Sequence, residues 1–208
     1  AGNFSYMGAP AISLQASVDA MAMDGTTILT NYNSLANKTY TATADIGLVA
    51  ENANSGTDLS SRLSTVSAPW KDGRWTFNST TMNFAKLTSL VPDGPYSALQ
   101  LGLTVRSERD SRNFISTALN MNATTTTDCI AAGNCNSVQT GSPLDVRYGR
   151  FALLNAAGPE DQNLPITLQS QYWSGTRFER NLSDSCSLYS AANLNVTGIT
   201  TLKDGTSG

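Results

Sequence analysis

Histidine is absent from the 208 residues of the sequence. It is the usual side chain that exchanges protons near neutral pH, so its absence excludes Ser-His-Asp and Cys-His catalysis. It also excludes zinc sites built on imidazole, which three cysteines at this spacing cannot replace. We therefore expect a protein that is not an enzyme and that folds without a cofactor. A calcium site made of carboxylates alone stays open.

Charge is also scarce, since Asp, Glu, Lys and Arg make up 14% of the chain, against roughly 25% in average soluble domains. Thr, Ser and Asn are abundant instead, as is typical of secreted β proteins, so we infer export. Thirteen basic and sixteen acidic residues include no basic run that could neutralise successive phosphates, which argues against nucleic-acid binding. No stretch approaches the roughly 20 apolar residues that cross a bilayer, so we expect no membrane insertion.

The three cysteines suggest one local disulfide. Cys129 and Cys135 bracket a short stretch with a flexible glycine, Gly133, and we predict that they are joined. Cys186 is left over. It either pairs outside this sequence or is a buried free thiol, and neither alternative makes it a nucleophile.

Apolar and polar residues alternate with period two in several places, which predicts half-buried strands. Residues 12–20 and 99–105 show this alternation most clearly. Asp-Gly dipeptides, which accept the positive φ angles of tight turns, follow the first of these strands at 24–25 and recur at 72–73. We predict a hairpin at each turn.

The carboxyl-terminal third is predicted to be β as well, with strands at 146–154 and 166–173. Frequent turns without crossover helices predict an all-β fold, either one antiparallel β-sandwich or two consecutive immunoglobulin-like sandwiches. The expected domains are a β-sandwich at 1–120, a polar loop or linker with the cysteine pair at 121–142, and a second β-rich subdomain at 143–208. That subdomain either completes the first sandwich or is truncated.

Two carboxyl-terminal segments are distinctive: residues 148–156 read YGRFALLNA, and residues 164–186 include Gln171-Tyr172-Trp173 and end in Asp184-Ser185-Cys186. They resemble the "YGRLRLxNAxG" and "LPVPLxAQYWNGxxFVxNxxDSC" segments of MshQ-like proteins of the mannose-sensitive haemagglutinin pilus. Residues 4–8 and landmarks between 70 and 103 add to the likeness. The resemblance implies an exported β-rich domain linked to type IV pilus biogenesis, and it supplies no catalytic residues. One departure concerns residues 107–112, which carry two arginines where the family's acidic "DxDG" would suggest calcium.

Trp70 and Trp75 are the candidate ligand contacts, because exposed aromatic rings beside a hairpin turn could stack on a glycan. Packing of the two indoles across the strand pair is the alternative. Glu160 and Asp161 could suggest a glycosidase, although adjacent acids in a Pro- and Gly-flanked loop are usually solvated. Four arginines could gather on one face of neighbouring strands and bind an anion, or lie along solvated edges: Arg147, Arg150, Arg177 and Arg180.

The sequence thus favours a non-enzymatic structural or adhesive module of an exported protein, extracellular and cell-surface or pilus-associated. Its expected partners are other pilus or cell-surface proteins and surface glycans. A glycan-binding adhesin domain is the alternative, and a carboxylate-dependent glycoside hydrolase is the least favoured reading.

Overall fold

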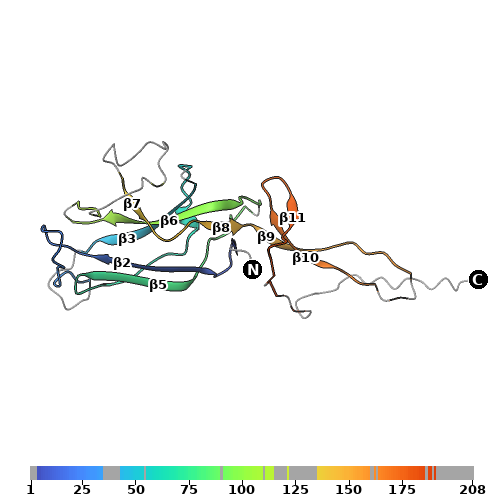
Figure 1. Cartoon of the computed structure of the whole chain (residues 1–208), viewed down its shortest axis with the longest axis horizontal. Coiled ribbons are helices and arrows are strands. Elements are labelled where there is room, and N and C mark those ends of the chain that lie inside the picture. The colour runs from blue at the N-terminus through green and yellow to red at the C-terminus, as the bar shows by residue number, and fades with distance from the viewer. Residues whose placement is uncertain are drawn as a thin grey trace, which may run out of the picture.

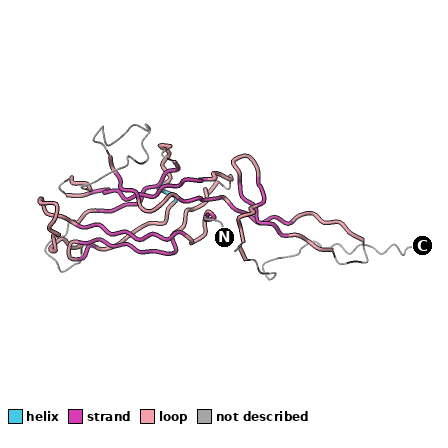
Figure 2. The backbone as a smooth tube through the Cα atoms, viewed as in Figure 1, coloured by secondary structure: helices cyan, strands magenta, loops and turns pink. Residues whose placement is uncertain are grey.

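The computed structural model confirms the all-β class. Strands dominate the described chain (Figure 2), and its one helical segment is the short 3-10 turn η1 (Ser60–Arg62). A two-layered sandwich lies at one end of the molecule and a smaller, narrower sheet at the other (Figure 1). No helix in this part of the chain is long and apolar enough to span a membrane. The structure describes residues 4–34, 43–53, 55–89, 91–109, 111–114, 121, 135–159, 162, 164–185, 187–188 and 190.

Sheet A forms one layer of the sandwich, in the order β1-β8-β6-β3, with β7 also paired to β6. The 12-residue β6 contains the predicted alternation at 99–105 and lies at the centre. It has β3 on one side, and β8 and β7 in succession on the other. Every pair is antiparallel except β1 with β8. The strands are β1 (Phe4–Tyr6), β3 (Asp45–Asn52), β6 (Tyr96–Ser107), β7 (Ser137–Gln139) and β8 (Leu144–Arg147).

Sheet B forms the second layer, in the order β2-β5-β4, from β2 (Ile12–Asp19), β4 (Trp70–Lys71) and β5 (Arg74–Met82). The hairpin predicted at Asp72-Gly73 is confirmed, because both residues have positive φ, at 50° and 82°, as a type I′ turn requires. The Asp24-Gly25 turn also forms. The residues after it pair with residues 20–22 through the bridge between Met21 and Ile28 and through two backbone hydrogen bonds, from Ala22 to Thr27 and from Leu29 to Ala20. β2 itself pairs along its length with β5, so the first predicted hairpin forms only beside its turn.

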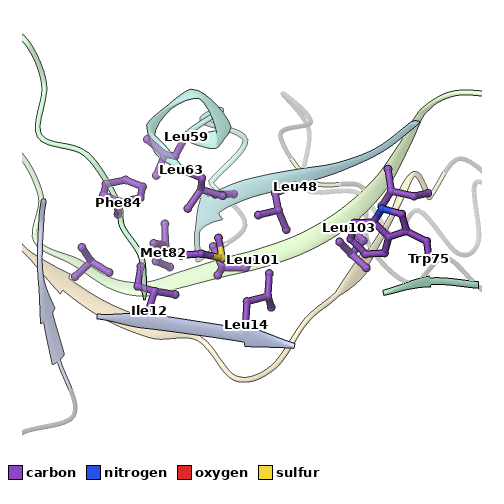
Figure 3. Close-up of a cluster of buried hydrophobic side chains, with 14 of the residues drawn as sticks. Ile12, Leu14, Leu48, Leu59, Leu63, Trp75, Met82, Phe84, Leu101 and Leu103 are labelled. Carbon is purple, nitrogen blue, oxygen red and sulfur yellow. The ribbon is translucent and has the colours of Figure 1, made fainter. Parts of the chain in front are cut away.

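The core fills the space between sheets A and B, and the period-two alternation decides which side chains reach it. Figure 3 shows Ile12 and Leu14 of β2 facing Leu48 of β3 and Leu101 of β6. Each of these four side chains is at most 6% exposed. Large apolar side chains from sequence-distant strands thus hold the two layers together.

A buried arginine closes the core near β1. Arg62 in η1 is 8% exposed, and its guanidinium forms an ion pair with Asp93. It also donates to the carbonyl of Ala85 at 2.8 Å and to the hydroxyl of Tyr96 at 3.1 Å. The aromatic ring of Phe84 lies beneath it, 4.3 Å from Cζ. Two stretches of the chain, residues 84–85 and residues 93–96, therefore converge on one cation from η1.

Sheet C is separate from the sandwich and has the order β11-β10-β9, formed by β9 (Gly149–Leu153), β10 (Leu168–Trp173) and β11 (Phe178–Arg180). The strand predicted at 146–154 is interrupted at Tyr148, where the chain leaves sheet A and enters sheet C. β7 lies within the stretch expected to be a linker, and β8 within the expected second subdomain, yet both pair with β6. The described residues thus form one sandwich and one additional three-stranded sheet.

Candidate functional site: the junction between the sandwich and sheet C

The junction is formed where β1, β8 and β9 meet. β8 ends at Arg147 and β9 begins at Gly149, so a single residue, Tyr148, connects the two sheets. β1 lies beside β8, and the amide of Met7 donates to the carbonyl of Arg147 at 2.9 Å. The amino-terminal strand is therefore positioned at the point where the chain crosses to sheet C.

The Tyr6 hydroxyl connects β1 to the far end of the chain. It donates to Oδ2 of Asp184 at 2.9 Å and accepts from the side-chain amide of Asn181 at 2.6 Å. Asn181 follows β11 and is 3% exposed, and its backbone amide donates to the carbonyl of Ser170 in β10. Both hydrogen bonds are partly buried, and the buried amide of Asn181 would be costly to leave without its partner. One phenol oxygen thus joins residue 6 to residues 181 and 184, which lie 175 and 178 positions further along the sequence.

Arg147 forms a second connection across the junction. One of its nitrogens donates to Oδ1 of Asn181 at 2.9 Å, while the rest of the guanidinium is paired with Asp145. Its Cζ lies 4.7 Å from the ring centre of Phe4 in β1 and 4.8 Å from that of Tyr172 in β10. The cation is therefore in contact with an aromatic ring from each side of the junction, a favourable arrangement for a partly buried arginine.

Close packing around Gly149 adds a third contact. A Cβ atom at this position would collide with the Tyr6 ring, so only glycine allows the ring to lie against the start of β9. On the outside, the Lys86 ammonium donates to the carbonyl of Gly149 at 2.9 Å and lies 4.4 Å from the ring centre of Tyr148. Lys86 of the sandwich therefore restrains Tyr148, the residue at which the chain passes from β8 to β9.

The environment of the junction shifts the pKa of two groups. Burial raises the pKa of the Tyr6 phenol above its ordinary value; the Asn181 hydrogen bond opposes this, and the Asp184 carboxylate adds to it. Burial alone would raise the pKa of Asp184, but hydrogen bonds from Ser187, Tyr6 and Ser170 together lower it below its ordinary value. Both shifts favour a neutral phenol donating to an ionised carboxylate.

Trp70 and Trp75, the predicted ligand contacts, are 3% and 2% exposed and form a directly opposed pair between β4 and β5. The indole nitrogen of Trp70 donates to the carbonyl of Ala44 at 2.8 Å, and the Trp75 ring stacks on Phe77. Both indoles are parts of the core, and the structure does not support a role for them as exposed stacking platforms. The two apolar strand faces bury them, as the packing alternative requires.

Two of the four arginines share a face, because Arg150 and Arg180 are both paired with Gln171 in sheet C. Arg150 lies over the ring of Phe178 at 3.6 Å, Arg147 is engaged at the junction, and Arg177 pairs with Glu179 at 3.0 Å. Glu160 and Asp161 lie outside the described residues, as do Cys129 and Cys186. Cys135 is disulfide-bonded, and its pairing with Cys129 stays a prediction. Within the described ranges, no group of three metal-ligating side chains could hold an ion.

Two grooves open on the sandwich. One, of about 520 Å³, runs between β2 and residues 140–145 and has Leu14, Leu101 and Leu144 among its lining residues. The other, of about 880 Å³, lies at the opposite end of β2 and is lined mainly by apolar residues, Tyr32 and Trp70 among them.

Sheet C carries exposed apolar side chains beyond the junction. Phe151 and Leu153 of β9 are 51% and 57% exposed, and their partners Ser170 and Leu168 place them on one face. Leu164 and Ile166, on the chain that returns to β10, are 45% and 62% exposed. Phe151 adds an exposed aromatic ring to these aliphatic side chains, and exposed apolar surface of this kind is typical of sites that contact other proteins.

Comparison with known families places the junction between two domains. Residues 1–136 match the model described as DUF6701, third domain, and residues 147–207 match DUF6701, fourth domain. The chain belongs to the DUF6701 family. No curated protein and no solved structure matches it. Tyr6 lies in the third DUF6701 domain, and Arg147, Asn181 and Asp184 lie in the fourth, so the hydrogen bonds of the Tyr6 hydroxyl join the two.

The segments that carry the family resemblance contain most of the junction residues, but their sequence does not bring them together. Tyr6 lies in residues 4–8, Asn181 and Asp184 lie in residues 164–186, and Arg147 is one of the four arginines that could bind an anion. Their shared signal was membership of those segments. Nothing in the spacing indicated that residue 6 would meet residues 181 and 184.

Proposed function

We propose that this chain is a non-enzymatic structural module of an exported, cell-surface or pilus-associated protein, in which the third and fourth DUF6701 domains act as one stiff spacer. The observation that carries the proposal is the Tyr6 hydroxyl, which is hydrogen-bonded to both Asn181 and Asp184 across a one-residue connection. Domains joined by a flexible linker move independently by default. A short connection reinforced by buried polar and aromatic contacts restrains that motion.

Three further features support a structural role. The sequence has no histidine, so the commonest proton carrier of enzymes is missing. The charged side chains of the junction are engaged with one another, as Arg147 is with Asp145. The polar composition and the resemblance of residues 148–156 and 164–186 to MshQ-like proteins favour a place at the bacterial surface among pilus or cell-surface proteins.

The buried indoles remove the observation that favoured the glycan-binding alternative. Trp70 and Trp75 were its candidate contacts, and both belong to the core. The exposed apolar face of sheet C, which includes Phe151 and Leu153, is compatible with adhesion to another protein. A structural module with protein contacts is therefore the function that the geometry supports best.

Distance measurement between spin labels tests the stiffness. Labels at Met23, which is fully exposed at the far end of the sandwich, and at Thr176 in the β10–β11 turn span the junction. An introduced keto amino acid can carry each label, which leaves the native cysteines untouched. We expect a narrow distance distribution that Tyr6→Phe broadens.

Tyr96→Phe is the matched control, because it removes a partly buried phenol hydroxyl that is hydrogen-bonded within the sandwich, to Asp93 at 2.7 Å. It should leave the distribution narrow even though it weakens the sandwich. A broad distribution in the unmodified protein would contradict the stiff spacer, and equal broadening by both variants would show that the junction is not what restrains the domains.

A further inference from the structure

The chain enters and leaves the sandwich through neighbouring strands. β1 is the first described strand and β8 the last strand of sheet A, and they pair in parallel, Phe4 with Asp145 and Tyr6 with Arg147. In Figure 1 β8 lies beside β9, at the end of the sandwich that faces sheet C. The first and last strands of sheet A are therefore adjacent.

Parallel pairing determines how tension reaches these strands. A force on the chain before Phe4 draws β1 toward its amino-terminal end, and a force beyond Tyr148 draws β8 toward its carboxyl-terminal end. The strands are then pulled in opposite directions along their length. Their evenly spaced hydrogen bonds are loaded together, whereas in an antiparallel hairpin pulled from its open end they would break one after another. This is a shear geometry.

We propose that β1, β8 and the Tyr6 hydroxyl form a mechanical clamp that carries tension directly between the chain entry and the fourth DUF6701 domain. This rests on the proposed structural function, since a clamp matters only in a protein held under tension. Residues 8–144 make up most of the sandwich and lie between the two clamped strands in sequence. They bear no tension as long as β1 and β8 stay paired.

Side chains reinforce the clamp on both strands. The Tyr6 hydroxyl passes force from β1 to Asn181 and Asp184, beyond β11, without using β8. Arg147 at the end of β8 lies over the Phe4 ring and donates to the same Asn181. Slippage of β1 along β8 would have to break these contacts together with the backbone ladder. Three residue pairs of β-ladder alone would be a short clamp, and the side chains extend it.

Single-molecule pulling of the full chain tests the clamp. With handles at the two ends, we expect an unfolding event that releases the chain from residue 8 to residue 144, roughly 450 Å at about 3.4 Å per residue. Tyr6→Phe should raise the unfolding rate at a constant force by roughly tenfold, because it removes a hydrogen bond to a charged group.

A second pulling geometry separates the clamp from ordinary stability. With both handles on exposed residues of the sandwich, Met23 and Val91, neither the β1–β8 ladder nor the Tyr6 hydrogen bonds to the fourth domain lie in the force path, so Tyr6→Phe should change the unfolding rate by less than about twofold. The clamp is refuted if Tyr6→Phe accelerates unfolding equally in both pulling geometries. It is also refuted if the variant, pulled from its two ends, unfolds no faster than the unmodified protein. A narrow spin-label distribution would leave the stiff spacer intact in either case.

Discussion

Replacing Arg62 by alanine removes the cation of a buried ion pair and tests how strongly that pair stabilises the sandwich. The substitution leaves the Asp93 carboxylate, 16% exposed, without its guanidinium partner and removes the donor to the Ala85 carbonyl. It also empties the space above the Phe84 ring. Breaking one side of a buried pair costs about 3–5 kcal/mol. A loss of this size is a large part of the 5–15 kcal/mol that typically stabilises a domain.

Arg74→Ala is the matched control. Arg74 forms two hydrogen bonds with the Asp19 carboxylate, at 2.6 and 2.9 Å, but its side chain is 54% exposed. Exposed pairs contribute at most about 1 kcal/mol, since water screens the charges and both side chains lose freedom. The same chemistry should therefore matter several times less at this site.

Urea unfolding provides the measurement, because urea does not screen charge. Fluorescence of Trp70 and Trp75 reports the sandwich, and Trp173→Phe in the background removes the signal of sheet C. With a slope of about 2 kcal/mol per molar urea, Arg62→Ala should lower the midpoint by roughly 2 M and Arg74→Ala by at most about 0.5 M. Equal shifts for the two variants would show that burial does not strengthen the Arg62–Asp93 pair.

The hydrogen bond between Tyr6 and Asp184 should hold between about pH 4 and pH 10. Asp184 has a folded pKa below its ordinary value of 3.8, so its contribution is complete above that pH and is lost as pH falls through the folded pKa. Tyr6 has a folded pKa above 10.0, so its contribution is complete below pH 10 and is lost as pH rises through the folded pKa. Spin-label distances should broaden outside this window, and no broadening at either limit would contradict the assignment. Peptide mapping under non-reducing conditions should find Cys135 joined to Cys129, whereas a peptide linking Cys135 to Cys186 would exclude the local loop.

The sequence predicted elements whose cause is local. Period-two alternation identified β2 and the middle of β6, because one face of each strand is buried and the other is not. The Asp72-Gly73 turn was predictable for a similar reason, since these two residue types tolerate positive φ. Such patterns depend on a few neighbouring residues and hold wherever the strand is placed.

Features that depend on distant segments were not predictable. Residues 146–154 look like one strand, but alternation does not say to which sheet each part belongs, and the chain changes sheets at Tyr148. Arg62 has no local sign of burial, because Asp93, Ala85 and Phe84 come from other segments. The meeting of Tyr6 with Asn181 likewise spans almost the whole chain.

The central position of β6 has a practical consequence for dividing the protein. The third-domain match ends at residue 136 and the fourth begins at 147, so β7 and all but the last residue of β8 fall between them. A fragment cut at 136 would leave one long edge of β6 bare and β1 without a neighbour. Bare edges of this kind invite pairing with other chains and aggregation. The smallest fragment that we expect to fold as a monomeric sandwich therefore ends at Arg147, the first residue of the fourth-domain match.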